Sequence, residues 1–501
     1  MDEALSFSDI VWGEDDAKAD KYIADYFVEY PGFDKLLEGK KRYVIGRKGS
    51  GKTAVLQKIK DLTSSDPQAF SAPISLRDFP LNAFKSLSDK SRKDKAKYVS
   101  IWKFLLLLEF CRLVLSDCSI EGDESVEQIK EFINNNFPFG YEMIEAVTAL
   151  SENQSKVKVG PRWANLEGDV VNRESAIRHV HYNHVCRMLI DLLKKIDCRS
   201  SYYLLVDELD EGFKSRDANH RLVILALLRA CEDLAIEFSN SNIKLFPIVA
   251  LRSDIFNFLE DNDLNKLDDY ILELQWTATE DNSRSLKRIA QSRIDHAYRT
   301  VIKDEQTDID SDKLWEMVFG SDEELWRSIT ILTFDRPRDL IKLLKYCQEE
   351  LMEENQLTKE VLNRAEARFS KWLFNEFRDE VQSFLPCWNE VLNCLIEIGN
   401  GKEQRKVLED KFKNEPRIAK WLNDESKDPR FITKLLFSYS VIGCVNNKRW
   451  IFQYKDPNIE YMNSYETYCV HYGFSKALRL PKKYQKELAQ ALSSVQTTEG
   501  E

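Results

Sequence analysis

Short apolar runs alternate with longer amphipathic stretches along the first half of the chain. The apolar runs cover residues 43–45, 202–206 and 243–251, and a further candidate strand covers 69–76. Continuous apolar runs of this kind are typical of parallel strands that are buried on both faces. In the stretches between them, apolar residues recur every three or four positions, as in helices that cover a sheet. The pattern predicts an α/β fold built on a parallel sheet.

A long, mostly helical stretch interrupts this alternation at residues 98–196. Its most apolar block, 101–115, contains three charged residues and is too short to span a bilayer, so we expect a buried helix there. Residues 157–159 alternate between valine and lysine, which favours a loop or hairpin. A helix over about 174–196 is then expected to lead into the strand at 202–206.

The second half of the chain is helical to about residue 380 and then changes character. Pro337 suits the first turn of a helix that follows the sequence Asp-Arg-Pro-Arg-Asp-Leu at 335–340. Residues 384–480 predict three helices and a hairpin, which together describe a winged helix. The expected parts are an N-terminal helical segment (1–40), a core (41–278) with a helical insertion (98–196), a helical lid (279–380), a winged helix (381–480) and a tail (481–501).

Composition restricts the class of protein. The chain has 501 residues and a formal net charge of −12, which argues against a surface coated in nucleic acid. Its ten cysteines lack paired C-x-x-C spacing, and no signal peptide stands at the N-terminus. We therefore expect reduced thiols, a cytoplasmic location, no membrane association and no zinc site.

A phosphate-binding pattern, G-x-x-x-x-G-K-[ST], stands between the first strand and the next helix. Glycines at 46, 49 and 51 allow positive φ angles, so that backbone N–H groups can point at phosphate oxygens. The lysine can reach the β- and γ-phosphates, and the final hydroxyl can ligate magnesium. A chance glycine turn would not need this strand–loop–helix context. The predicted nucleotide-binding residues are Gly46, Arg47, Lys48, Gly49, Ser50, Gly51, Lys52 and Thr53.

Two acids end the apolar strand at 202–206, as a Walker B motif requires. Asp207 is expected to hold Mg²⁺ together with Thr53, and Glu208 to act as the base or to orient water. The acids at 210–211 are expected to be solvated loop residues.

The strand at 243–251 ends in Arg252-Ser253-Asp254, where a polar side chain would face the γ-phosphate or the attacking water. Arg252 or Ser253 could report the nucleotide state. Alternatively, Arg252 pairs with nearby acids, and the residues alone favour neither interpretation.

Aromatic residues of the N-terminal segment recur at helical spacing before Pro31-Gly32. We expect a helix with one apolar face that packs beside the nucleotide. The residues on this face are Tyr22, Ile23, Tyr26, Phe27 and Tyr30.

Taken in order, the two Walker motifs, the Arg252 strand end, the Arg336-Pro337-Arg338 helix start and the winged helix resemble ATPases of the AAA+ and STAND group. The chain looks like the stand-alone bacterial P-loop ATPases of that group over about residues 10–480. The resemblance implies ATP as the nucleotide, with Mg²⁺, and an oligomer or a partner effector protein.

The resemblance also implies roles for arginines. Arg338 matches the sensor-2-like arginine of the lid, and Arg252 or Ser253 stands at sensor 1, where members of the group commonly carry Asn or Thr. The expected catalytic set is thus Lys52, Glu208, Arg252 and Arg338. An arginine finger usually comes from a neighbouring subunit, and its candidates here are Arg221, Arg229 and Arg293.

Three functions remain open at this point. The first is an ATP-driven switch, which by analogy with related ATPases would serve bacterial defence or signalling. The second is a DNA-stimulated ATPase, because the segment 384–480 holds fifteen Lys and Arg against twelve Asp and Glu. The third is a scaffold that holds nucleotide without hydrolysis, against which Glu208 argues.

Overall fold

The computed structural model describes most of the chain. The described residues are 5–77, 79–88, 96–137, 142–153, 156–159, 178–209, 218–259, 264–278, 283–302, 310–382, 384–397, 402–446, 449–456, 459 and 467–481.

The chain divides into two compact units, each of which is described by itself. We call residues 29–48 and 52–274 the sheet unit. We call residues 1–28, 49–51 and 275–501 the helical unit. Three residues from the middle of the phosphate-binding pattern, Gly49–Gly51, therefore cluster with the helical unit.

The sheet unit contains a five-stranded parallel sheet in the order β2-β5-β6-β1-β7. This confirms the predicted α/β class with a parallel sheet. All four predicted strands are present, and a fifth strand, β7, joins the edge beside β1. The strands are β1 (Tyr43–Gly46), β2 (Ala69–Ser75), β5 (Ser201–Asp207), β6 (Lys244–Arg252) and β7 (Ile271–Leu274).

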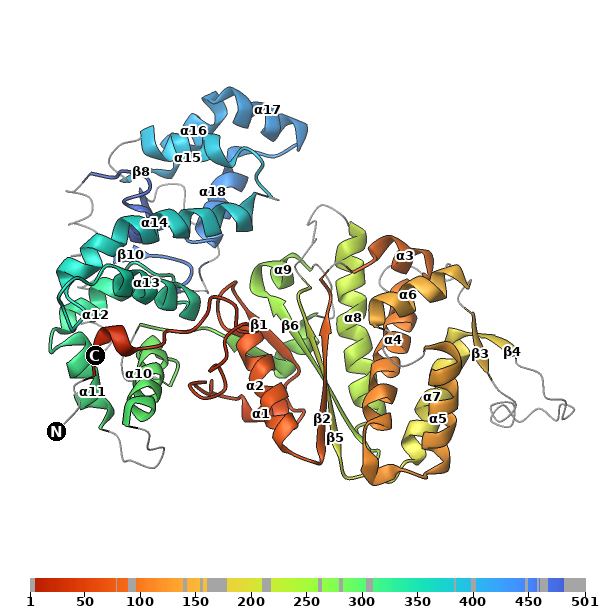
Figure 1. Ribbon diagram of the computed structural model, residues 1–501. Coiled ribbons are helices and arrows are strands. Elements are labelled where there is room, and N and C mark those ends of the chain that lie inside the picture. The colour runs from red at the N-terminus through yellow and green to blue at the C-terminus, as the bar shows by residue number, and fades with distance from the viewer. Residues whose placement is uncertain are drawn as a thin grey trace, which may run out of the picture. The chain divides into compact units, whose positions relative to one another are not determined.

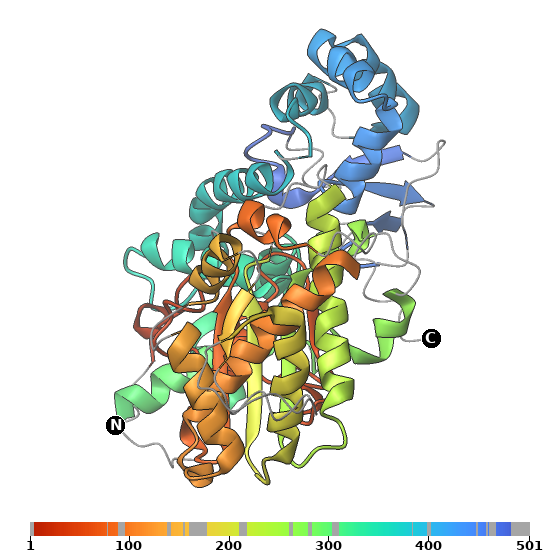
Figure 2. The same cartoon turned by 90° about the vertical axis from the view of Figure 1, so that its right-hand side faces the viewer.

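Helices lie on both faces of this sheet (Figure 1). One face carries α1 and α2, and the other carries α4 and α8; Figure 2 looks onto this second layer. The helices of the unit are α1 (Asp34–Leu37), α2 (Lys52–Ser65), α3 (Leu81–Ser86), α4 (Ala96–Leu115), α5 (Glu124–Asn136), α6 (Met143–Glu152), α7 (Tyr182–Lys195), α8 (Ala218–Glu237) and α9 (Ser253–Phe258), with 3₁₀ turns at Cys118–Ile120 and Leu264–Tyr270.

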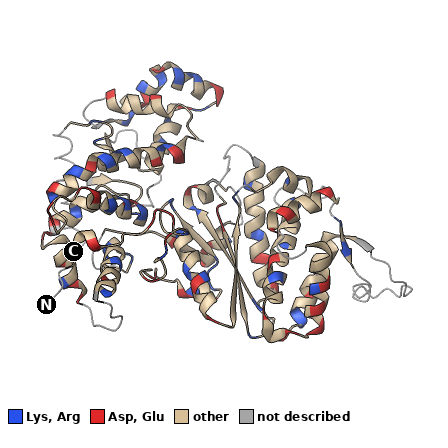
Figure 3. Cartoon of the chain, viewed as in Figure 1, with Lys and Arg blue, Asp and Glu red and all other residues tan. Residues whose placement is uncertain are grey.

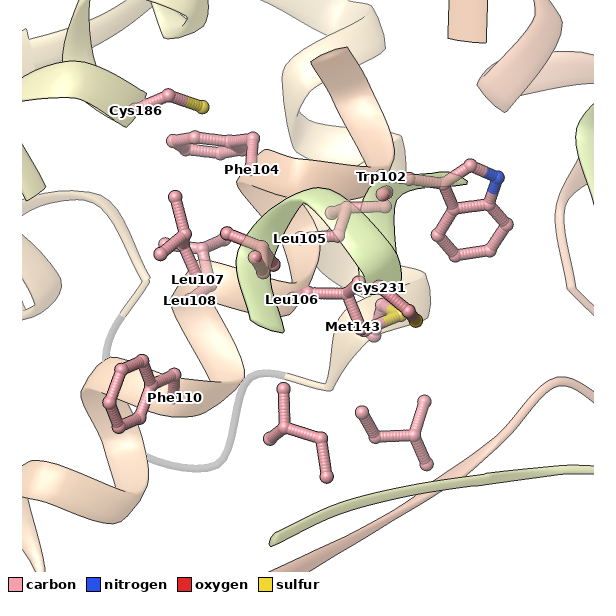
Figure 4. Packing of buried hydrophobic residues seen from close by; sticks show 14 of the residues in the cluster. Trp102, Phe104, Leu105, Leu106, Leu107, Leu108, Phe110, Met143, Cys186 and Cys231 are labelled. Carbon is pink, nitrogen blue, oxygen red and sulfur yellow. The ribbon is translucent and has the colours of Figure 1, made fainter. Parts of the chain in front are cut away.

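Helix α4 is the centre of the hydrophobic core of this unit. Its buried apolar residues occur on all of its sides, as expected of a helix packed on several faces, and Figure 4 shows its aromatic and leucine side chains among residues of other helices. The indole Nε1 of Trp102 is nevertheless satisfied, because it donates to the carbonyl oxygen of Val223 on α8 (2.9 Å). The buried helix expected over 101–115 is thus present and extends from Ala96 to Leu115.

The helix expected to begin near residue 174 starts later. Residues 178–181 form a strand, β4 (Arg178–His181), which pairs antiparallel with β3 (Lys156–Val159), and α7 starts at Tyr182. The prediction of a helix start near residue 174 was wrong because the helical spacing of apolar residues at 180–192 also covers the end of β4. The pairing of β4 with β3, which lies more than twenty residues earlier, leaves no signal in the local sequence. The hairpin expectation at 157–159 is confirmed for β3, and residues 160–177 lie outside the described residues.

The helical unit contains a run of helices followed by a small antiparallel sheet. The helices are α10 (Leu286–Ile302), α11 (Ser311–Phe319), α12 (Glu323–Thr330), α13 (Pro337–Glu349), α14 (Lys359–Val381), α15 (Trp388–Glu397), α16 (Arg405–Asn414), α17 (Pro416–Asp424) and α18 (Pro429–Ser438), with 3₁₀ turns at Phe7–Asp9 and Tyr472–Phe474. The sheet has the order β10-β9-β11-β8, formed by β8 (Lys402–Gln404), β9 (Ile442–Asn446), β10 (Arg449–Ile451) and β11 (Thr467–Val470).

The expected hairpin corresponds to β9 and β10, whose connecting residues 447–448 lie outside the described residues. Helix α17 and strands β8 and β11 were not predicted. Both strands are short, and β11 gains its partners from β8, more than sixty residues earlier, and from β9.

The N-terminal helix expected around Tyr22–Tyr30 is absent from the described residues, where this stretch consists of turns and irregular chain. Tertiary hydrogen bonds hold this stretch in place instead of a helix. The Tyr26 hydroxyl donates to the Asp20 carboxylate, and the backbone oxygen of Tyr26 accepts a hydrogen bond from Ser292 on α10 (2.9 Å). Aromatic spacing suggested a helical face, but the rings of Tyr22 and Tyr26 instead contact His296 of α10 from a turn-rich segment.

The ten cysteines are present as thiols, and nine of them are buried. In the part of the chain that the structure describes, we find no helix that is long and apolar enough to cross a membrane.

Candidate nucleotide-binding site

The phosphate-binding pattern forms the connection between β1 and α2. Gly49 and Gly51 adopt φ angles of 80° and 96°, which only glycine adopts without strain. Gly46 differs from our expectation, because it is the last residue of β1 and lies opposite Arg252 of β6 in the sheet. Its role is to end the strand, and the positive φ angles are confined to the two later glycines of the pattern.

Lys52 and Thr53 open helix α2. The Lys52 ammonium donates to the backbone oxygens of Gly46 and Arg47, both at 3.0 Å, so that its charge is held over the loop. Arg47 and Lys48 are half-buried. The main chain thus positions the lysine where the helix N-terminus adds its own partial positive charge.

Asp207 links the predicted Walker B strand to the same helix. The Thr53 hydroxyl donates to Asp207 Oδ2 at 2.9 Å, and Asp207 Oδ1 accepts the backbone N–H of Glu208 at 2.9 Å. The two residues expected to ligate magnesium are therefore in direct contact, although they are 154 positions apart in sequence.

Glu208 has a strained backbone and a restrained side chain. Its φ of 63° lies in the left-handed region, which non-glycine residues seldom adopt and which is enriched at functional sites. Its carboxylate accepts a hydrogen bond from Ser75 and forms an ion pair with Arg77 (3.4 Å). Sequence reasoning missed Ser75 and Arg77; the available signal was the polar end of the predicted strand at 69–76.

Strand β6 lies between β1 and β5, so Arg252 at its end is next to the loop and near the strand that carries Asp207. The Arg252 guanidinium contacts Asp254 through two hydrogen bonds, Nε to Oδ1 at 3.0 Å and Nη2 to Oδ2 at 2.6 Å. The alternative in which Arg252 pairs with a nearby acid is therefore observed. Ser253 is half-buried and begins α9.

The middle of the loop has its own contacts within the helical unit. The indole of Trp276 donates to the backbone oxygen of Ser50 (2.8 Å). The backbone N–H of Arg338 donates to the backbone oxygen of Gly49 (3.3 Å). A Cβ added at Gly49 would stand 3.0 Å from Cβ of Arg338. Only a glycine allows this approach. Trp276 was not predicted, since nothing in its local sequence signals the contact.

The two arginines that flank Pro337 have different environments. Arg336 is buried and pairs with Asp339 (2.8 Å) and Glu380 (3.2 Å). Although burial alone would lower the pKa of Arg336, these carboxylates raise it, so the guanidinium stays charged. Arg338 is partly exposed, pairs with Glu376 (3.1 Å) and has a buried Nε without a hydrogen-bond partner in the described structure. Arg336 thus has a structural role, while Arg338 retains an unused donor.

The arginine-finger candidates are also distinguished by their contacts. Arg293 is 4% exposed, donates to the backbone oxygens of Trp12 and Ile289, and lies over the Tyr26 ring. A side chain buried in this way cannot serve a neighbouring subunit. Arg229 is engaged by Glu232 and Asp233 on the surface of α8, and Arg221 is half-buried on the same helix.

The residues present fit a magnesium–nucleotide complex. Ser50 Oγ is buried without a hydrogen-bond partner in the described structure, at a position where a phosphate oxygen would provide one. A Cβ added at Gly51 would meet open space, so the loop leaves room beside its backbone. The hydroxyl of Thr53 and the carboxylate of Asp207 are the oxygen ligands that Mg²⁺ prefers.

Three comparisons relate the chain to known proteins. A family model described as the FunZ-associated C-terminal helical domain matches residues 284–378, which span α10 to α14 up to its last turn. An 80.3 kDa protein of transposon gamma-delta from Escherichia coli K12 is 21% identical over 377 residues, which is 69% of this chain. The chain spans about half the length of that relative (48%). The crystal structure of Cdc6p from Pyrobaculum aerophilum is 12% identical, with a TM-score of 0.30, covering 95% of this chain and 98% of that one.

Proposed function

We propose that this protein is a P-loop ATPase that acts as an ATP-driven switch. The observation that carries the proposal is the hydrogen bond between Thr53 and Asp207, with Glu208 next in sequence in a strained conformation. The left-handed backbone at Glu208 costs free energy that a scaffold which only binds nucleotide would not need to spend. A carboxylate held in place by Ser75 and Arg77 suits a group that must orient water.

In this proposal, the loop amides and Lys52 bind the triphosphate. Thr53 and Asp207 would hold Mg²⁺, which would supply positive charge against the triphosphate. Glu208 accepts a proton from, or orients, the attacking water. Arg252 keeps its place at the strand end through Asp254 and reports the occupancy of the site.

Arg338 is the proposed lid sensor. The support is its backbone contact with Gly49 and the unsatisfied donor at its Nε. A change in the loop on nucleotide binding would be transmitted through this contact to helix α13. The switch would thereby assemble further copies of the chain or expose a surface for a partner effector protein, and we place it in the cytoplasm, in a bacterial defence or signalling role.

The test compares two site variants with matched controls. Lys52→Ala should abolish binding of a fluorescent ATP analogue, whereas Lys60→Ala, an exposed lysine on the same helix, should not. Glu208→Gln should keep binding and lower the turnover number by about 100-fold or more. Its control is Glu237→Gln at the far end of α8. Unchanged turnover in Glu208→Gln would reject the catalytic assignment.

The native mass of Glu208→Gln with and without Mg-ATP tests the switch itself. A shift to a larger, discrete assembly supports ATP-driven association. An unchanged mass rejects assembly as the output.

A second candidate is a DNA-stimulated ATPase in which residues 381–480 form a winged helix. Helix α18 precedes the β9–β10 pair and exposes Arg430 and Lys434 one turn apart, which suits phosphate contacts. Figure 3 shows that acidic residues are interspersed with basic ones along the helices of this part, so the charge signal is modest.

If this second candidate holds, replacing both Arg430 and Lys434 by Glu should abolish stimulation of the ATPase by duplex DNA. Reversal of Lys406 and Lys420, exposed on α16 and α17, is the matched control. A turnover rate that is indifferent to DNA in the unmodified protein would exclude this candidate.

A further inference from the structure

A cavity of about 690 Å³ lies within the sheet unit, away from the phosphate-binding pattern, none of whose residues line it. Its walls are the end of β2 (Pro73–Ser75), the end of α4 with the turn that follows, α5, and the start of α6. A cavity of this size is in the range that holds a small organic ligand. It belongs to the helical insertion, to which the proposed function gives no task.

One part of the lining is apolar and one residue carries an unused donor. Val126, Ile133, Phe137 and Met143 are all buried and line the cavity. Arg112, also in the lining, pairs with Glu109 but leaves its Nη2 buried without a hydrogen-bond partner in the described structure. Such a donor calls for an acceptor oxygen from outside the protein.

The charged lining is mainly acidic, with five acids against two bases. Arg112 is matched by Glu109, and Lys130 lies 3.7 Å from Glu127. Three acids then remain without a basic partner in the lining, Asp117, Glu121 and Glu142. An anion such as a nucleotide would be repelled here, whereas a cation is attracted.

Asp117 keeps its negative charge. Although burial alone would raise the pKa of Asp117, hydrogen bonds from Ser119 and Tyr202 lower it below its usual value. The other two acids, Glu121 and Glu142, are exposed at the rim.

We propose that this cavity binds a small organic cation that has an apolar body and an oxygen able to accept a hydrogen bond from Arg112. The apolar walls take the body, and the acids at the rim take the positive charge. The ligand is thus recognised by chemistry opposite to that of the phosphate-binding loop.

The cavity is also connected to the proposed catalytic residue. Ser75, which lines it, donates a hydrogen bond to Glu208. A ligand that shifts the end of β2 would therefore alter the position of Glu208 and change the rate of hydrolysis. This coupling, unlike the binding itself, rests on the proposed ATPase function.

Binding is tested on the full chain without nucleotide, so that its outcome is independent of any ATPase activity. The probes are tyramine, 4-ethylphenol and 3-(4-hydroxyphenyl)propionate, which share a phenol oxygen and a similar apolar body and are positive, neutral and negative. Saturation-transfer NMR and calorimetry should rank the amine first, with the anion weakest. Absence of binding by all three probes, or an anion that binds as well as the amine, would overturn the proposal.

A pair of charge-removing substitutions tests the location. Glu121→Gln with Glu142→Gln should weaken binding of the amine by about fivefold, since each exposed carboxylate contributes a modest attraction. The matched control removes two exposed acids that do not line the cavity, by Glu152→Gln with Glu360→Gln. Equal affinity in the two double variants would overturn the assignment to this cavity.

The coupling has a separate readout. Saturating amine should change the turnover number of the unmodified protein by about twofold or more, as expected of a modest allosteric coupling, and should have no such effect on Ser75→Ala. An equal effect on both proteins, or none on either while binding persists, rejects the coupling and leaves the binding site in place.

Discussion

Asp335 offers a quantitative test of the structure that does not depend on any proposed activity. Its side chain is 8% exposed, its backbone has a φ of 50°, and its Oδ1 has no hydrogen-bond partner in the described structure. Burial raises the pKa of Asp335 from 3.8 to about 6, with Asp339 adding to the rise and Lys455 opposing it. Asp335→Asn removes the charge, keeps the shape and is tolerated in the left-handed region.

The sign and size of the effect follow from proton linkage. Because the pKa is higher in the folded state, the folded protein holds the proton more tightly than the unfolded chain between pH 3.8 and about pH 6. The free energy of unfolding therefore falls as the pH rises through this window, and the penalty is complete above it. A shift of about two units corresponds to ~3 kcal/mol, which is the upper limit of what Asn restores near neutral pH.

The assay is urea unfolding followed by tryptophan fluorescence at several pH values. Asp335→Asn should match the unmodified protein near about pH 4 and exceed it by up to ~3 kcal/mol near about pH 7.5. The control is Asp424→Asn, which changes an exposed aspartate at the end of α17. A gain that is independent of pH, or a loss of stability near neutral pH, would refute the reasoning.

Two further predictions use the same unfolding assay, and a third is checked by nucleotide binding. Arg336→Met should destabilise the protein by about 3–5 kcal/mol, because it leaves two buried carboxylates without their cation. Arg338→Met should lower the free energy of unfolding by less than about 1 kcal/mol. Equal losses would contradict the different roles of the two arginines. Phe104→Ala should cost about 3–5 kcal/mol through the cavity left in the core, and a loss below about 1 kcal/mol would place Phe104 outside it. Gly49→Ala should weaken nucleotide binding through its strained φ and its contact with Arg338, and binding at the unmodified affinity would count against the loop geometry.

The comparison of sequence and structure separates local from long-range information. The strands at 43–45 and 202–206 and the buried helix after residue 101 were predictable because a strand or helix buried on all sides must be apolar along its length. The strand–loop–helix form of the phosphate-binding pattern was predictable because its glycines and lysine lie within eight consecutive residues.

Other features depended on residues that only the fold brings together. Ser75 and Arg77 reach Glu208 across more than a hundred positions, and no local pattern records that contact. Similarly, the choice between Arg336 and Arg338 as the structural arginine depends on Glu380, far along the chain on α14.

The sequence by itself determined where the proposed nucleotide site would be placed, since that proposal rests on short motifs at strand ends. Tertiary structure alone decided that the aromatic N-terminal segment would be a set of turns against α10, that Arg293 would be buried, and that the helical insertion would enclose a cavity beside Ser75. The physical reason is that burial and pairing are properties of the surroundings, which a residue's neighbours in sequence do not specify.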